Sequence, residues 1–159
     1  MKLYIAQHGD ALSKEQNPER PLSDKGQTDV LALAQLLIEA NINISNIIHS
    51  GKTRTVQTAN LIASHFGKAV ATECSSLISP NSDPERLFQA HSDIAADTLL
   101  ISHMPFVSRL VSYLTIGNDG SIVEFTPGTA VCLHRTFDEN DTTWKIEWMI
   151  SPAIHGPKI

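Results

Sequence analysis

The chain has few cysteines and few aromatic residues, and these shortages narrow the kind of protein it can be. Only two of its 159 residues are cysteines, Cys74 and Cys132, and they form no Cys-x-x-Cys motif. A disulfide framework is therefore not expected, and both thiols are interpreted as reduced. Aromatic residues make up only 6% of the chain, so any core must be mainly aliphatic.

Long apolar runs are also missing. The run Leu3–Ala6, which follows Lys2, stops at Gln7. It is shorter than the apolar core of about 7–15 residues in a signal peptide, and no run approaches the roughly 20 residues that cross a bilayer. We therefore expect a cytoplasmic protein that does not enter a membrane.

Positive charge is in deficit. Lys and Arg number 12 against 17 Asp and Glu, which leaves a formal net charge of −5. Surfaces that bind nucleic acid or anionic lipid need a broad positive field, so neither partner is expected. Any anion must be bound by a local positive pocket. With 42% hydrophobic residues, no internal repeat and no linker, residues 1–159 are expected to form one domain.

What the chain does contain is an alternation of short apolar runs with segments of helical periodicity. We expect strands at 2–6, 47–49, 69–72 and 98–102, and helices that begin near Ser23, Thr53, Pro84 and Pro105. Two β-rich runs, 130–136 and 144–150, are typical of a hairpin, with Trp144 and Trp148 on one face. The pattern predicts a three-layer α/β fold: a mostly parallel central sheet, helices on both faces and an antiparallel C-terminal hairpin.

Polar residues follow three of the predicted strands. The first strand leads into Gln7-His8-Gly9, the second into 50–54, which contains Arg54, and the fourth into Ser102-His103. Ligands of open α/β sheets bind at the carboxyl ends of the strands, so His8, Arg54 and His103 are expected to converge there. The alternative is that the two histidines are polar caps on unrelated loops.

These residue types suit phosphoryl transfer. Neutral imidazole is a good nucleophile near pH 7, and a guanidinium at a helix N-terminus binds anions. One histidine attacking phosphorus, with Arg54 and a second histidine on the oxygens, forms a plausible site without a metal. The seven histidines of the chain show no metal-ligand spacing, so neither a metal nor another cofactor is expected.

The ordered motifs resemble the histidine phosphatase superfamily, which has the phosphoglycerate mutase-like fold. Within it they resemble the SixA-type phosphohistidine phosphatases, over nearly the whole chain. The segments that carry the resemblance are Gln7-His8-Gly9-Asp10, Arg20-Pro21-Leu22-Ser23 with Gly26, Arg54-x-x-Gln57-Thr58-Ala59 and Ser102-His103-Met104-Pro105.

The resemblance implies a role for each matching residue. His8 would be the nucleophile that forms a phosphohistidine intermediate, Arg20 and Arg54 would hold the phosphate, and His103 would stabilise the transferring group. The implied substrate is a phosphohistidine on a phosphotransfer or signalling protein, with inorganic phosphate as product.

One residue departs from the family pattern. Gln7 stands where the family has arginine, and an amide lacks the charge and the bidentate fork of a guanidinium. Slow turnover is the expected consequence. Lys52 is a candidate auxiliary cation, with a solvated surface lysine as the alternative interpretation.

The residue that would protonate the leaving group is also open. Asp83 is a candidate acid, but it precedes Pro84 and equally suits a helix N-cap. Two other functions stay open. One is a phosphate-binding module with little or no turnover; the other is a small-molecule phosphomonoesterase, which would need a deeper pocket and a credible acid.

Overall fold

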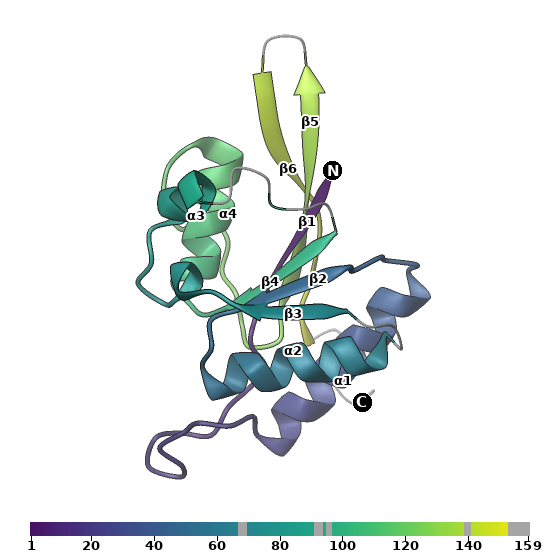
Figure 1. Ribbon diagram of the computed structural model, residues 1–159, viewed down its shortest axis with the longest axis vertical. Coiled ribbons are helices and arrows are strands. Elements are labelled where there is room, and N and C mark those ends of the chain that lie inside the picture. Colours follow the sequence, from purple (N-terminus) through teal and green to yellow (C-terminus); the bar gives the residue numbers. More distant parts are fainter. Residues whose placement is uncertain (67–69, 91–93, 95–96, 139–140, 153–159) are drawn as a thin grey trace.

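A computed structural model describes residues 1–66, 70–90, 94, 97–138 and 141–152. It shows one six-stranded sheet with a pair of helices on each face (Figure 1). In chain order the elements are β1 (Lys2–Gln7), α1 (Asp24–Glu39), β2 (Asn46–His49), α2 (Thr53–His65), β3 (Ala71–Cys74), the 3-10 helix η1 (Ser76–Ile78), α3 (Pro84–Ala90), β4 (Thr98–Ser102), α4 (Phe106–Ile116), β5 (Ala130–Asp138) and β6 (Asp141–Ile150).

The strands lie in the order β3-β2-β4-β1-β5-β6. The first four of these are parallel, and β5 and β6 are antiparallel additions at one edge. This arrangement confirms the predicted α/β class and the C-terminal hairpin. Because Gln7 is opposite Ser102 and His49 is opposite Ile101, β1, β2 and β4 end at the same edge of the sheet.

Alternation along β1 separates two cores. Leu3 and Ile5 pack with α3 and α4 on one face, whereas Tyr4 and Ala6 pack with α1 and α2 on the other. All four side chains are buried, as expected for a central strand covered on both sides. The strand that leads to His8 is therefore held firmly from both faces.

The N-terminus of α1 follows its sequence signal. Ser23 is the N-cap, and its hydroxyl accepts a hydrogen bond from the backbone N–H of Gly26. Helical spacing of Val30, Leu33 and Leu37 then places their side chains against the sheet, where all three are buried.

The predicted common face of Trp144 and Trp148 is wrong. A β-bulge in the β5–β6 pairing leaves Glu147 unpaired, because Cys132 is opposite Trp148 while Leu133 is opposite Ile146. One extra residue reverses the alternation of a strand. Trp144 consequently packs in the core beneath α4, and Trp148 packs beside Tyr4 on the opposite face.

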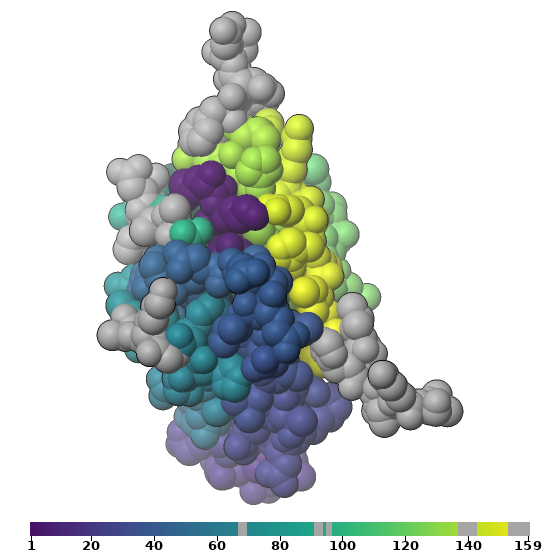
Figure 2. All heavy atoms as spheres, turned by 90° about the vertical axis from the view of Figure 1, so that its right-hand side faces the viewer, coloured from purple at the N-terminus to yellow at the C-terminus, as the bar shows by residue number. Residues whose placement is uncertain are grey.

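The same hairpin also covers the first strand. Figure 2 shows the N-terminal residues of β1 beside β6 at the surface, where Lys2 Nζ lies 2.7 Å from Glu147 Oε1. Both hairpin strands are longer than the sequence predicted.

The third strand was predicted at the wrong place. β3 spans Ala71–Cys74, two residues later than expected, and residue 69 lies outside the described residues. All four residues of β3 are exposed at the sheet edge, so no apolar alternation marks the strand.

No described helix has the length and apolar character needed to cross a bilayer.

Candidate active site

His8 follows β1 directly and is only 7% exposed. Its backbone N–H donates to the carbonyl of Ser102, which ties it to the end of β4. Its side-chain Nδ1 lies 2.7 Å from the carbonyl oxygen of Gly9. A carbonyl can only accept, so Nδ1 carries the proton and the neutral ring presents a lone pair on Nε2.

The electrostatic setting keeps this imidazole neutral. Burial lowers the pKa of His8 to about 4, and the positive charges of Arg54 and Arg20 act in the same direction. The hydrogen bond to Gly9 opposes this shift without cancelling it. At neutral pH the His8 ring is therefore buried and uncharged.

Arg54 contacts that lone pair. Its Nε–H donates to Nε2 of His8 over 3.0 Å. Arg54 is the second residue of α2, and the N-cap of that helix, Lys52, makes no side-chain capping bond. The helix thus adds its unfilled N-terminus to the charge of the guanidinium, a combination that favours an anion beside His8.

His103 lies beside His8 with its ring centroid 5.0 Å away, at an interplanar angle of 61°. It follows β4, is 3% exposed, and places Nε2 2.6 Å from the hydroxyl of Ser50. Ser50 in turn lies 3.1 Å from the hydroxyl of Thr55, which donates to the carbonyl of Lys52.

The direction of these bonds follows from their last acceptor. Thr55 gives its proton to a carbonyl, so it accepts from Ser50, and Ser50 then accepts from Nε2–H of His103. Within the described part of the chain, Nδ1 of His103 is buried without a hydrogen-bond partner. Because Nε2 carries the ring proton, Nδ1 holds a lone pair.

Positive neighbours act strongly on His103. Burial is the main cause that lowers its pKa to about 3, and the charges of Arg54, Lys52 and Arg20, with that of His8 when it is protonated, lower it further. The pKa of Arg54 is also lowered, mainly by burial and then by the charge of Arg20. The structure therefore concentrates positive charge around two neutral imidazoles.

Arg20 is held at the end of the loop that follows His8. Its backbone is in the left-handed region, with φ of 49°, and its N–H donates to Asn17. Its side-chain Nε–H donates to the carbonyl of Leu12 over 3.1 Å. These bonds fix the guanidinium near both catalytic candidates.

A pocket of about 430 Å³ joins these cations. Its lining residues are Lys14, Pro18, Glu19, Arg20, Gly51, Lys52, Thr53 and Arg54. The predicted Arg20, Lys52 and Arg54 are thus brought together. Lys14 was missed, because it lies in an irregular loop and its only signal was a position between His8 and Arg20.

The motif that follows Arg54 holds the loop in place. Thr58 accepts from the backbone N–H of Gly9 at 3.1 Å and donates to the carbonyl of Arg54. Gln57 accepts from the backbone N–H of Leu22 at 2.7 Å. These contacts, which the sequence did not reveal, lock the segment after His8 against the helix that carries Arg54.

Gln7 is the last residue of β1 and is 8% exposed. Its backbone N–H donates to the carbonyl of Thr129. Its side-chain Oε1 is buried and finds no hydrogen-bond partner among the described residues. The residue before His8 is therefore a neutral amide whose oxygen atom has no hydrogen-bond partner among the described residues. An arginine at this position would add a positive charge.

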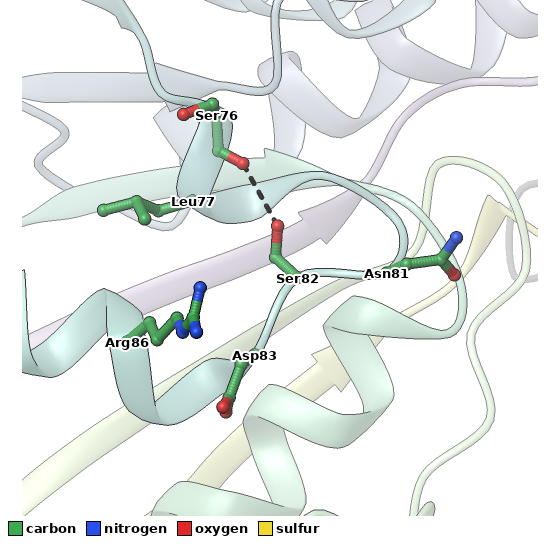
Figure 3. Close-up of a pocket in the computed structure, with 6 residues that line it drawn as sticks. All are labelled: Ser76, Leu77, Asn81, Ser82, Asp83 and Arg86. Carbon is green, nitrogen blue, oxygen red and sulfur yellow. Dashed lines mark hydrogen bonds between the residues drawn. The ribbon is translucent and has the colours of Figure 1, made fainter.

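Asp83 lies in a second pocket, of about 450 Å³, which has no lining residue in common with the pocket of Arg54. Its Oδ1 accepts from the backbone N–H of Glu85, the bond of an N-cap on α3. Figure 3 shows its carboxylate pointing away from Ser76 and Ser82. This geometry matches the helix-cap interpretation of Asp83.

A metal centre was not expected from the sequence. Within the described residues, no three His, Cys, Asp or Glu side chains are grouped so that they hold a metal ion. The candidate site consists of imidazoles, guanidinium groups and a helix N-terminus.

A buried neutral histidine, a second histidine and two arginines thus lie together at the carboxyl edge of this sheet. The family model of the histidine phosphatase superfamily (branch 1) matches residues 3–76, which include His8, Arg20 and Arg54. Over residues 3–76 the chain is similar to this superfamily, and over nearly its whole length it is similar to SixA.

The chain is similar to a SixA sequence and to a solved SixA structure over nearly the whole length of each. Phosphohistidine phosphatase SixA of Escherichia coli (strain K12) is 27% identical over 158 residues, which cover 96% of this chain and 95% of SixA. The solved structure of SixA complexed with tungstate superposes with a TM-score of 0.80 at 26% identity, covering 98% of this chain and 99% of that one.

A more distant structure shows the fold alone. YhfR of Bacillus stearothermophilus superposes with a TM-score of 0.68 at 14% identity, covering 95% of this chain and 98% of YhfR. The phosphoglycerate mutase-like architecture expected from the sequence is thus confirmed.

Proposed function

We propose that this protein is a phosphatase that hydrolyses a phosphohistidine carried by another protein, through a covalent phosphohistidine on His8. The observation that carries the proposal is the neutral His8 ring, with Nδ1–H donated to Gly9 and the Nε2 lone pair 3.0 Å from Arg54 Nε. The similarity to SixA, a phosphohistidine phosphatase that has been solved with tungstate, supports it. Tungstate is a tetrahedral oxyanion like phosphate.

In the first step Nε2 of His8 attacks phosphorus. A bond forms from Nε2 to phosphorus while the bond from phosphorus to the substrate imidazole breaks, and that imidazole leaves with a proton from solvent. In the second step water attacks the phosphorus of phospho-His8, inorganic phosphate leaves, and His8 returns to its neutral form.

Arg54 controls access to the nucleophile. In the phosphate-free protein its Nε–H occupies the lone pair of His8. A bound phosphoryl group offers the guanidinium charged oxygen atoms, which are stronger acceptors than a neutral imidazole. Binding therefore turns Arg54 toward the phosphate and releases the lone pair for attack.

Charge stabilisation comes from the surrounding cations. Arg20 and Arg54 hold the equatorial oxygens of the phosphoryl group, and the N-terminus of α2 points its dipole at the same place. The negative charge of the phosphoryl group raises the pKa of His103 from its low resting value, which favours an imidazolium that donates to the transferring group.

Gln7 sets the rate. Loss of one electrostatic donor from a catalytic site slows turnover by about 10²–10³-fold. Gln7 supplies a neutral amide where the family pattern has an arginine, so the protein is a slow phosphatase. Retention of His8, Arg54 and His103 supports turnover over mere binding, because a binding module has no need of the nucleophile.

The choice of phosphohistidine rests on the leaving group. A protonated imidazole leaves phosphorus far more readily than an alkoxide, so it needs little help from an acid. Asp83, the acid candidate, is engaged at the N-cap of α3 and lies in another pocket. The site therefore favours a phosphoramidate over an alcohol ester.

The test is phosphate release from a phosphohistidine-bearing protein and from p-nitrophenyl phosphate, with and without EDTA. The natural chain, His8→Ala and Gln7→Arg are compared. We expect turnover of the phosphohistidine substrate that EDTA leaves intact, that disappears in His8→Ala and that increases in Gln7→Arg.

Two other results would replace the proposal. If the natural chain releases no more phosphate than His8→Ala but still binds tungstate, the protein is a phosphate-binding module. If p-nitrophenyl phosphate is the preferred substrate, it is a small-molecule phosphomonoesterase.

A further inference from the structure

The pocket beside His8 is larger than its proposed phosphate requires. Its volume of about 430 Å³ lies in the range of pockets that hold a drug-sized ligand. Arg20 and Arg54 serve the phosphoryl group, which leaves Lys14 and Lys52 without a role in the reaction. Both lysines are exposed.

These lysines come from different parts of the chain. Lys14 lies on the loop between β1 and α1, and Lys52 lies on the turn between β2 and α2. They line the same pocket as Arg54, whose Nε reaches His8. His8 itself does not line this pocket, so a ligand with its phosphoryl group at His8 meets the two lysines only where it extends past Arg54.

The lining of this pocket has four cationic side chains and one carboxylate. None of the ion pairs found within the described ranges involves Lys14, Arg20, Lys52 or Arg54. The single carboxylate of the lining, Glu19, accepts a long hydrogen bond from the hydroxyl of Thr53 at 3.4 Å. The chain as a whole has a net charge of −5, so this pocket is a local concentration of positive charge on an acidic protein.

Lysine suits a flexible acidic partner. An ammonium is a point charge on a long stem, so it accepts a carboxylate from several directions, unlike the fixed fork of arginine. The field of Lys52 also reaches the centre of the site, because its charge helps to lower the pKa of His103. Recognition by Lys52 and phosphoryl binding therefore share one electrostatic region.

We propose that Lys14 and Lys52 form a subsite for an acidic side chain next to the phosphohistidine of the partner protein. This inference rests on the proposed phosphohistidine phosphatase function and narrows its substrate class. The preferred partner presents its phosphohistidine on an exposed segment flanked by Asp or Glu. Exposed charge pairs of this kind are individually weak, and two together correspond to a preference of about tenfold.

The experiment uses two synthetic peptides that carry phosphohistidine, one flanked by Asp and Glu and one flanked by Ser. We compare kcat/KM for both peptides in the natural chain, in the double variant Lys14→Gln/Lys52→Gln and in Lys145→Gln. Lys145 is an exposed lysine on β6 and serves as the matched control. Each measurement is repeated at low and high salt.

The natural chain and Lys145→Gln are expected to prefer the acidic peptide about tenfold at low salt, and less at high salt. The double variant is expected to treat both peptides alike. Equal kcat/KM values in the natural chain, or a preference that survives in the double variant, would overturn the subsite.

A binding measurement separates this inference from the proposed function. His8→Ala is titrated with the same two peptides carrying a non-hydrolysable phosphohistidine analogue. If no phosphohistidine is turned over, the proposed function fails, yet a preference for the acidic peptide that is lost on adding Lys14→Gln/Lys52→Gln still establishes the subsite. If both peptides bind His8→Ala equally, the subsite fails, whatever the turnover.

Discussion

The hydroxyl of Ser50 accepts a hydrogen bond from Nε2–H of His103 across 2.6 Å, and this contact joins the ends of β2 and β4. Ser50 is 9% exposed, and it passes the chain of hydrogen bonds on to Thr55 and the carbonyl of Lys52. The tautomer and orientation of His103 therefore depend on a residue that does not itself contact phosphate in our proposal.

Replacement of Ser50 by alanine leaves Nε2–H of His103 buried without an acceptor. A buried polar group without its partner costs about 1–3 kcal/mol of folding stability. Because the imidazole also loses its fixed orientation, we expect turnover to fall about tenfold, by analogy with metal-ligating histidines that lose a hydrogen-bonded partner. The measurements are urea unfolding and kcat/KM on a phosphohistidine substrate.

Two further variants make this test specific. Ser50→Thr keeps the hydroxyl and should restore most of the activity. Ser64→Ala removes an exposed hydroxyl on α2 whose hydrogen bond, among the described residues, is to Leu61 of the same helix, so it should alter neither quantity. A Ser50→Ala variant as active as the natural chain would remove Ser50 from the positioning of His103.

The low pKa values of the two histidines predict acid-labile stability. His8 and His103 have pKa values of about 4 and about 3 in the folded protein, against 6.5 for an ordinary histidine. Between the folded pKa values and 6.5, these two histidines bind more protons in the unfolded chain than in the folded one. The free energy of unfolding therefore decreases as the pH falls through this range. Two such groups give a slope of at most about 2.7 kcal/mol per pH unit near pH 5.

Urea unfolding at intervals from pH 7 to pH 4.5 measures this slope. In His8→Gln one of the two titrating groups is absent, so the slope should fall by about half. A free energy of unfolding that stays constant over this range in the natural chain would show that the histidines are not held neutral.

Much of the site was predictable because sheet topology brings strand ends together. Short apolar runs marked β1 and β4, and in a parallel sheet their carboxyl ends meet at one edge. His8 and His103 followed from this rule alone. The hydrogen bonds that orient them did not, because a motif places Ser50 and Thr58 near a strand end without stating which group each one contacts.

The errors have physical causes as well. The extra residue Glu147 places Trp148 on the opposite face of the sheet from Trp144, and an alternating sequence pattern does not predict such a bulge. β3 was misplaced because an exposed edge strand lacks the apolar alternation that locates buried strands. Lys14 was missed because charge in an irregular loop has no periodicity, and only the folded loop brings it to Arg54.

Gly26 holds α1 against the loop that follows His8. A Cβ at this position would lie 2.0 Å from the carbonyl oxygen of Asp10, a contact that requires backbone movement. We expect Gly26→Ala to lower the free energy of unfolding by about 1–3 kcal/mol, through overpacking. Because the shifted loop carries Arg20, KM for the phosphohistidine substrate should also rise.

Gly117 provides the matched control. It lies at the C-cap of α4 with φ of 73°, and an added Cβ meets open space there. Gly117→Ala should therefore cost about 1 kcal/mol from backbone strain alone and leave KM unchanged. Equal effects of the two substitutions on KM would show that the contact between Gly26 and Asp10 does not position the loop.

Gln7→Arg is expected to exchange stability for rate. The new guanidinium supplies charge beside His8, so turnover should increase by up to about 10²–10³-fold. The same group is placed in a position only 8% exposed and next to His8, on which the charges of Arg20 and Arg54 act, so the variant without a bound anion should unfold at a lower temperature. Bound tungstate neutralises this repulsion and should raise the unfolding temperature more in the variant than in the natural chain.

Gln7→Met separates charge from shape. It keeps an unbranched side chain of similar length and removes the amide whose Oε1 is buried without a partner. If the amide contributes a hydrogen bond to the transferring phosphoryl group, Gln7→Met is slower than the natural chain, whereas equal rates mean that Gln7 only fills space. A Gln7→Arg variant that gains tungstate stabilisation without gaining rate would show that charge at this position binds phosphate but does not limit its transfer.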